Sequence, residues 1–273
     1  MSENTPLLSV KNLTATLATR FETVEAVRGI SFDIAKGESL GFVGESGCGK
    51  SVTARAVMRL AAEGTAVALG GAVMFKGRDL LKISDQDILD VRGRQIAMVF
   101  QDPMSSLNPV MTVGSQLDDI LRRHLNLTKK QARVRTLELL NAVGIPNAAS
   151  RVDDHPHQFS GGQRQRIMIA IAISCDPELL IADEPTTALD VTVQAQILRL
   201  LMKLRDERGM SLMLITHDFG VVAGMVERVN VMYRGEIVET GAVDDIFANP
   251  QHAYTQSLLA AVPRLERAGE LAS

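Results

Sequence analysis

The chain has 273 residues, 46% of them apolar and 22% charged, which is ordinary for a globular protein with a substantial core. Its net charge of −3, from 29 basic and 32 acidic side chains, lacks the basic excess of a nucleic-acid-binding surface, so no nucleic-acid partner is predicted. The two cysteines, Cys48 and Cys175, are too few for a disulfide scaffold and form no CxxC pair, which favours a reducing, cytoplasmic compartment.

The N-terminal third of the chain predicts β-structure. Residues 1–13 show no charged start followed by a long apolar stretch, so no secretory signal is predicted. Val27–Ile34 alternates in part between apolar and polar residues and precedes the turn Lys36-Gly37, which is typical of a strand. Ala72–Phe75 shows a similar pattern before Lys76-Gly77.

Short apolar runs farther along the chain predict buried parallel strands, and the longer segments between them have helical spacing. Alternating strands and helices of this kind predict an α/β domain with a mostly parallel sheet. The strand predictions are Leu40–Val43, Ile96–Phe100, Leu179–Ala182 and Leu212–Ile215, with a later hairpin of Val229–Tyr233 and Glu236–Glu239. The helix predictions are Val52–Leu60, Lys130–Val143, Gln163–Ser174 and Val193–Arg205.

The stretch from about Asp102 to Val152 is rich in helical patterns and contains no convincing strand. We expect it to form a helical lobe inserted between two strands of the α/β core. The longest helix-like apolar stretch, Ile167–Cys175, is far shorter than the roughly 20 residues that cross a bilayer. Any membrane span in a system that uses this protein would therefore come from other chains.

Residues 44–51 read GESGCGKS and fit the phosphate-binding pattern G-x-x-x-x-G-K-[ST] between a predicted strand and a predicted helix. Glycines let backbone N–H groups turn toward phosphate oxygens, and a helix N-terminus favours the anion. Lys50 is expected to reach the β- and γ-phosphates, and the Ser51 hydroxyl to ligate Mg²⁺. A chance glycine-rich turn is the alternative, which the flanking elements disfavour. The expected nucleotide contacts are Gly44, Glu45, Ser46, Gly47, Cys48, Gly49, Lys50, Ser51 and Val52, with no catalytic role for Cys48.

The predicted strand Leu179–Ala182 continues into Asp183 and Glu184. Ligands of open α/β sheets bind at the carboxyl ends of strands, so these carboxylates fit the second half of a phosphate-loop site. Asp183 is expected to hold Mg²⁺, and Glu184 to orient or deprotonate the attacking water. An exposed turn before Pro185 is the plain structural alternative.

Two other strand ends carry polar residues that would reach the same edge. His217 follows Leu212–Ile215 and is expected to contact the γ-phosphate, although a lone histidine is more often structural. Gln101 follows Ile96–Phe100, and its amide is expected to contact Mg²⁺ or the attacking water. The predicted catalytic set is therefore Glu184, His217 and Gln101, and the predicted metal set is Ser51, Gln101 and Asp183.

Residues 159–166, FSGGQRQR, resemble the signature sequence of ATP-binding-cassette (ABC) proteins and lie just upstream of the acidic strand, as in that family. Ser160 and the N–H groups of Gly161 and Gly162 would form an anion cradle at a helix start, next to Gln163. The resemblance implies that this cradle closes on ATP held by an opposite subunit. Two cassettes would then enclose two ATP molecules.

Further landmarks resemble the same family over nearly the whole chain. Residues 187–190, TALD, resemble the D-loop, in which Asp190 would cross the dimer interface. Phe21 stands where the family places an aromatic ring on adenine, with a core position as the alternative. Val52 departs from the Thr that many members carry and offers only its backbone N–H. The segments 101–109, QDPMSSLNP, and 249–259, NPQHAYTQSLL, resemble peptide- and nickel-importer ATPases, although the tail could simply be a helix packed on the core.

The resemblance implies an α/β P-loop NTPase core (ABC ATPase) with a mostly parallel sheet, an antiparallel β subdomain and an inserted α-helical subdomain. The expected parts are residues 1–101 for the first part of the core, 102–165 for the helical subdomain, 166–245 for the rest of the core and 246–273 for the tail. The implied function is ATP hydrolysis with Mg²⁺, which energises uptake of peptides or related small solutes such as nickel or opines. The implied partners are two membrane permeases, a second cassette that is identical or paralogous, and indirectly an extracytoplasmic solute-binding protein, with the chain peripheral on the cytoplasmic face of the inner membrane.

One alternative stays open at this point, and two others are disfavoured. A soluble ABC ATPase of a C–P lyase-type complex is the closest, because such proteins resemble peptide-importer ATPases. A DNA-repair ABC ATPase is disfavoured, because the long coiled coil that usually divides such a cassette has no room in this chain. A P-loop kinase or GTPase is disfavoured, because this chain carries the signature sequence. A metal site at Asp153, Asp154, His155 and His157 is not expected, because that stretch matches the loop before the family's signature.

Overall fold

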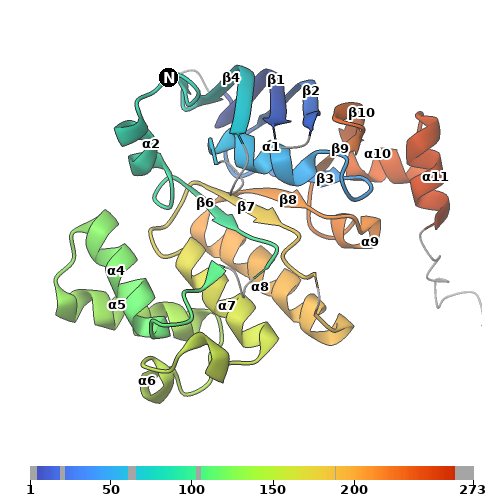
Figure 1. Ribbon diagram of the computed structural model, residues 1–273. Coiled ribbons are helices and arrows are strands. Elements are labelled where there is room, and N and C mark those ends of the chain that lie inside the picture. Colours follow the sequence, from blue (N-terminus) through green and yellow to red (C-terminus); the bar gives the residue numbers. More distant parts are fainter. Residues whose placement is uncertain (1–4, 19–21, 61–65, 103–105, 188, 262–273) are drawn as a thin grey trace, which may run out of the picture.

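The computed structural model describes residues 5–18, 22–60, 66–102, 106–187 and 189–261 (Figure 1). A six-stranded sheet with the order β10-β9-β3-β8-β7-β6 lies at its centre. The neighbours from β9 to β6 are parallel, whereas β10 runs antiparallel to β9. These strands are β3 (Ser39–Val43), β6 (Ile96–Val99), β7 (Leu179–Asp183), β8 (Ser211–Ile215), β9 (Arg228–Tyr233) and β10 (Glu236–Ala242).

The predicted parallel strands and the late hairpin are confirmed. Every residue of β3, β7 and β8 is buried, because helices or a second sheet cover both faces. Alternate residues point to opposite sides, so Leu180 belongs to one apolar cluster and Ile181 to the other. The hairpin turns at Arg234 and Gly235, which both have positive φ.

A second, antiparallel sheet has the order β2-β1-β4-β5. Its strands are β1 (Leu8–Ala18), β2 (Thr23–Ile34), β4 (Ala66–Phe75) and β5 (Arg78–Asp79). It contains the two strand segments that the sequence predicts, both extended toward the N-terminus, and adds β1, which the sequence analysis did not predict. It lies over α1 (Lys50–Val57), and the Phe32 and Phe42 rings meet edge-on at 4.8 Å between the two sheets. The expected antiparallel β subdomain is therefore present.

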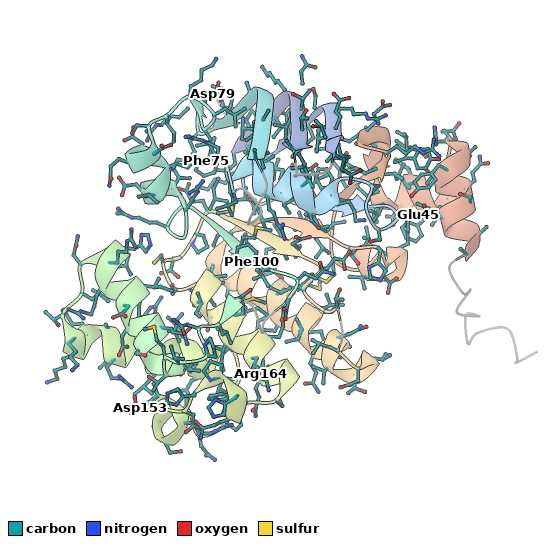
Figure 2. All side chains as sticks on the ribbon, viewed as in Figure 1. Glu45, Phe75, Asp79, Phe100, Asp153 and Arg164 are labelled. Carbon is teal, nitrogen blue, oxygen red and sulfur yellow. The ribbon has the colours of Figure 1, made fainter. Side chains whose placement is uncertain are left out.

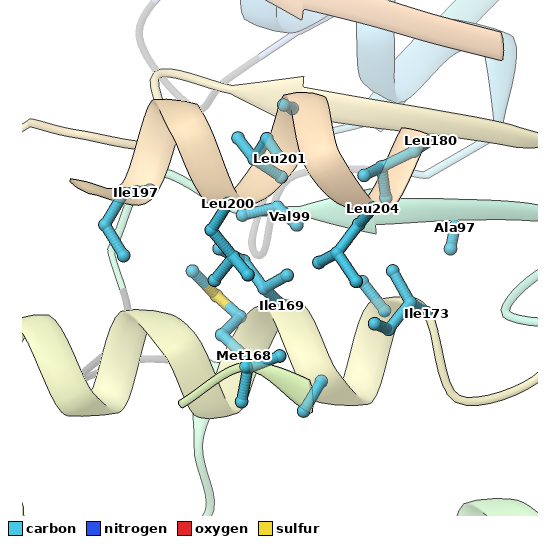
Figure 3. Packing of buried hydrophobic residues seen from close by; sticks show 14 of the residues in the cluster. Ala97, Val99, Met168, Ile169, Ile173, Leu180, Ile197, Leu200, Leu201 and Leu204 are labelled. Carbon is cyan, nitrogen blue, oxygen red and sulfur yellow. The ribbon is translucent and has the colours of Figure 1, made fainter. Parts of the chain in front are cut away.

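Helices α7 (Gly161–Ala172) and α8 (Val191–Arg208) cover the other face of the central sheet. Figure 3 shows Ile169 of α7 and Ile173, the residue just after it, facing Leu200 and Leu204 of α8, beneath the sheet residue Leu180. Each fully buried side chain of this size contributes about 1.5–3 kcal/mol through removal of apolar surface from water. The packed layer holds the starts of both helices in fixed positions.

The helical lobe consists of α4 (Val113–Leu125), α5 (Lys129–Ala142), α6 (Ala148–Arg151) and the 3₁₀ helix η1 (Pro156–Gln158). Figure 1 shows α4 and α5 in green and α6 in yellow-green. The described residues between β6 and β7 contain no strand, in agreement with the predicted insertion. Inside the lobe, Asp118 accepts hydrogen bonds from Thr136 (2.6 Å) and Arg133 (3.0 Å), which joins α4 to α5. The expected boundary after residue 165 falls inside α7, and the division of the chain into four parts stays a prediction.

The remaining helices are α2 (Asp85–Val91), α9 (Phe219–Val222), α10 (Val243–Ala248) and α11 (Ala253–Ala261). The helix α11 lies at the edge of the molecule near α10 and β10, where Figure 1 shows it in red. Across the described ranges, the structure has no helix with the length and apolar character that a bilayer crossing requires.

Candidate functional site

The candidate functional site lies at the carboxyl edge of the central sheet. The neighbouring strands β3, β8, β7 and β6 are parallel, so their carboxyl ends meet at one edge. Beyond β3 comes the phosphate-binding loop, and beyond β6 and β8 come Gln101 and His217. Asp183 ends β7 and Glu184 follows it. The structure thus brings the predicted strand-end residues to one place.

The loop between β3 and α1 needs its glycines for steric reasons. A Cβ on Gly44 would lie 2.2 Å from the Met232 carbonyl oxygen, and one on Gly49 would lie 2.4 Å from the Ala26 carbonyl oxygen. Both glycines also have positive φ, which other L-residues rarely adopt. Because Gly49 is the N-cap of α1 and Lys50 its first residue, the positive end of the helix dipole faces the loop.

Lys50 is only 4% exposed, and its ammonium group lies within the loop. Its Nζ donates hydrogen bonds to the carbonyl oxygens of Gly44 (2.7 Å) and Glu45 (2.8 Å) and lies 3.6 Å from the Cys48 Sγ. The buried charge is therefore satisfied by backbone oxygens. A flexible four-carbon stem lets such an ammonium exchange these partners for phosphate oxygens.

Ser51 and Asp183 form a direct pair: the Ser51 hydroxyl donates a 2.7 Å hydrogen bond to Oδ1 of Asp183. Asp183 is 1% exposed, and this burial raises the pKa of its carboxyl, while the Ser51 hydrogen bond and the Arg55 charge act in the opposite direction. A hydroxyl beside a carboxylate is a hard oxygen donor set of the kind Mg²⁺ prefers. The residues present therefore fit Mg²⁺.

Glu184 is the centre of a polar cluster. Its Oε2 accepts hydrogen bonds from the Gln101 Nε2 (3.0 Å) and the Thr187 hydroxyl (2.8 Å), and its Oε1 lies 3.4 Å from the His217 Nδ1. The backbone of Glu184 has a φ of 46°, and its N–H donates to the Ile215 carbonyl of β8. Such a left-handed conformation is uncommon in a non-glycine residue and directs the carboxylate to the sheet edge. The sequence analysis missed the contact between Thr187 and Glu184, because only the fold shows where the Thr187 hydroxyl points.

A cavity of about 370 Å³ opens beside this cluster. Phe21, predicted to stack on adenine, lies outside the described residues, but Glu22 and Val24 next to it in the chain line the cavity. Most of the lining comes from the phosphate-binding loop, the β1 and β2 ends and the polar cluster around Glu184. The lining residues are Leu17, Glu22, Val24, Ala26, Ser46, Gly47, Gly49, Lys50, Ser51, Val52, Gln101 and Glu184.

The signature residues lie in a second cavity of about 540 Å³ at the starts of α7 and α8. Ser160 is the N-cap of α7: its hydroxyl accepts from the Gln163 N–H (3.3 Å), and the Gln163 side chain accepts from the Ser160 N–H (3.1 Å). Asp190 is the N-cap of α8, and its carboxylate accepts a hydrogen bond from the Val193 N–H (3.0 Å). Gly161 and Gly162 also line this cavity, which shares no lining residue with the cavity at the loop.

The acidic and histidine residues before the signature are held in other interactions. Asp153 pairs with Arg133 (2.8 Å), and Asp154 pairs with Arg151 (3.0 Å). The rings of His155 and His157 stack with 5.8 Å between their centres. Within the described ranges, no group of three or more His, Cys, Asp or Glu residues is arranged to hold a metal ion.

Fold and site together define a P-loop NTPase of α/β architecture that carries an additional signature cradle. The family model "ABC transporter" matches residues 27–187, and the model "Oligopeptide/dipeptide transporter, C-terminal region" matches residues 238–272. The chain therefore belongs to the ABC transporter family.

Curated relatives and solved structures agree with this family. The Dipeptide transport ATP-binding protein DppD of Bacillus subtilis is 52% identical over 96% of this chain and 78% of its own length. The Oligopeptide transport ATP-binding protein OppD of the same organism is 52% identical over 97% of this chain and 74% of its own length. A dimeric post-hydrolysis structure of the ATP-binding cassette MJ0796, bound to ADP and Pi, superposes with a TM-score of 0.75 at 28% identity, covering 86% of this chain and 98% of that one.

Proposed function

We propose that the protein is the ATP-hydrolysing subunit of an ABC importer for peptides or closely related small solutes. The observation that carries the hydrolytic part is the Glu184 cluster. One carboxylate receives hydrogen bonds from Gln101 and Thr187, lies near His217, and stands next to the Ser51–Asp183 pair. A carboxylate held in this way can align a water molecule and accept its proton, which is typically worth 10²–10⁴-fold in rate.

Phosphate binding follows from the loop. Lys50 and the N–H groups at the start of α1 supply positive charge and donors where the γ-phosphate would lie. Ser51 and Asp183 would hold Mg²⁺, with the Gln101 amide within reach of Glu184. When bound, the ion would neutralise charge on the phosphates during transfer.

The separation of the two cavities supports a dimer. Ser160, Gly161 and Gly162 lie in a different cavity from Lys50, so within one chain the signature cradle does not reach the loop's nucleotide. We propose that a second cassette, identical or paralogous, brings its signature cradle to the first one's loop. The dimeric MJ0796 cassettes favour this arrangement.

The transported solute is inferred from the relatives. Relatives that match at least 95% of the chain are named for dipeptide transport, oligopeptide transport or, putatively, peptide import. These names favour a peptide importer over a C–P lyase-type complex. The proposed partners are two membrane permeases and, through them, an extracytoplasmic solute-binding protein. The proposed location is the cytoplasmic face of the membrane.

The test is to recover the tagged chain from its native host with its associated proteins and to measure peptide uptake. Co-purification with multi-span membrane proteins, and loss of labelled di- or oligopeptide uptake in a deletion strain, are the expected results. Uptake should return with the wild-type gene and not with Lys50→Ala. Recovery only in a soluble complex, with peptide uptake intact in the deletion strain, would contradict the proposal.

A further inference from the structure

The C-terminal helix α11 touches the phosphate-binding loop at one point. The hydroxyl oxygen of Tyr254 accepts a 2.9 Å hydrogen bond from the backbone N–H of Glu45. The two residues are 209 positions apart in the chain. Figure 2 labels Glu45 beside α11, on the side of the molecule away from the helical lobe. The tail therefore contacts the backbone of the loop itself.

The contact falls on a peptide unit that Lys50 also holds. The Gly44 carbonyl and the Glu45 N–H belong to the same planar group, whose two polar ends point in opposite directions. The Lys50 Nζ binds the carbonyl end (2.7 Å), and Tyr254 binds the N–H end. The backbone also packs closely here, because a Cβ on Gly44 would lie 2.2 Å from the Met232 carbonyl oxygen. The peptide is thus fixed from both sides.

Tyr254 is itself firmly placed. Its ring packs on the ring of Tyr233, at the end of β9, with 4.3 Å between centres. Just before α11, the Glu239 carboxylate of β10 accepts from the N–H groups of Gln251 (2.7 Å) and His252 (3.1 Å). Burial raises the pKa of the Tyr254 hydroxyl, which keeps the group neutral at physiological pH. A neutral phenol oxygen on a well-supported helix can hold the loop amide without adding charge near the nucleotide.

We propose that Tyr254 is a positioning residue for the nucleotide site: its hydroxyl fixes the Gly44–Glu45 peptide so that the loop keeps its phosphate-binding shape when the Lys50 ammonium turns to the nucleotide. Packing of the tail on the core would need only the Tyr254 ring. The hydrogen bond to the loop amide is the feature that packing does not explain. The inference rests on the proposed ATP-binding function. It makes α11, through Tyr254, one of the elements that position the phosphate-binding loop.

The loss of one neutral hydrogen bond predicts a moderate effect. Tyr254→Phe keeps the ring contact with Tyr233 and removes only the acceptor for the Glu45 N–H. ATP binding should weaken by about three- to tenfold, the range expected for one such bond. The effect should appear in Kd and KM rather than in kcat, because the Glu184 cluster is untouched.

The experiment compares the full chain carrying Tyr254→Phe with a Tyr233→Phe control, which removes a neighbouring hydroxyl while the bond to Glu45 stays. Kd for a non-hydrolysable ATP analogue, KM and kcat for ATP, and hydrogen exchange of the loop peptide in nucleotide-free protein are measured for both. The expected result is weaker binding and faster loop exchange in Tyr254→Phe alone, with an unchanged melting temperature.

Wild-type-like Kd and loop exchange in Tyr254→Phe would overturn the positioning role. Failure of the proposed ATP-binding function would look different. In that case the wild-type protein itself would not bind the ATP analogue. Equal losses in Tyr254→Phe and Tyr233→Phe would also overturn the inference, since they would assign the effect to packing of the two rings.

Discussion

The Ser51 hydroxyl donates a 2.7 Å hydrogen bond to the Asp183 carboxylate and so joins the first turn of α1 to the end of β7. Asp183 is almost fully buried, and the carboxyl pKa is raised chiefly by that burial. An ionised carboxylate in this position is costly until a cation compensates it. The geometry that suits Mg²⁺ is therefore expected to destabilise the nucleotide-free protein.

Asp183→Asn should stabilise the nucleotide-free protein and abolish Mg²⁺-dependent ATP hydrolysis. A raised native pKa means that the native state holds its proton to higher pH than the unfolded chain does. The free energy of unfolding therefore falls as the pH rises through the native pKa of Asp183. The gain in melting temperature from the substitution should be full above the native pKa and should shrink as the pH falls from there toward the ordinary carboxyl value of 3.8. Each 1 kcal/mol corresponds to about 2–4 °C in a domain of this size.

Melting curves without nucleotide at several pH values check this prediction. Asp206→Asn, on the exposed surface of α8, is a matched control that should show no such trend. A lower melting temperature for Asp183→Asn at pH 8 would show that the carboxylate stabilises the empty site.

Lys50→Ala should weaken ATP binding severely, because the ammonium is the cation at the loop. Removing a charge-assisted hydrogen-bonding group costs about 1.5–3 kcal/mol, which is roughly a 10- to 150-fold loss of affinity. Isothermal titration with ATP measures the change. Lys36→Ala, in an exposed turn outside the loop, should bind like the wild type. Unchanged affinity in Lys50→Ala would remove the loop from the binding site.

Glu184→Gln should bind ATP but lose about 10²–10⁴-fold of turnover, because an amide cannot accept the proton of the attacking water. If the signature cradle acts in a dimer, the variant should also accumulate as a dimer with ATP, which size-exclusion chromatography reports. Glu178→Gln, just before the amino end of the same strand and paired with Lys76, should keep its activity. Near wild-type turnover in Glu184→Gln would show that another group activates the water.

The sequence predicts the parts of the site that lie next to strong local patterns. Leu40–Val43 before the loop and Leu179–Ala182 before Asp183 are fully buried runs, so their ends could be placed at one edge of a parallel sheet. The helices α5, α7 and α8 begin within two residues of the positions that their periodicity indicates. In these segments the apolar positions of the sequence follow the buried face of the strand or helix.

The features that sequence analysis missed depend on irregular backbone or on distant contacts. The alternation of β1 is interrupted near Asn12, which has a φ of 48° where the pairing with β2 shifts register. The bond from Glu45 to Tyr254 requires the β9–β10 hairpin to carry α11 back to the loop. Neither is visible in a window of neighbouring residues.

The Thr187 hydroxyl supplies a last prediction, because it donates a 2.8 Å hydrogen bond to the carboxylate oxygen of Glu184 that also receives the Gln101 amide. Thr187→Val keeps the shape but leaves this oxygen with one donor fewer, so the carboxylate should be less well aligned with the attacking water. We expect kcat to fall by about three- to tenfold, as for one net hydrogen bond, with KM for ATP nearly unchanged. Thr187→Ser keeps the hydroxyl and should restore most of the rate. If Thr187→Ser is as slow as Thr187→Val in steady-state ATPase assays, the methyl group rather than the hydrogen bond positions Glu184.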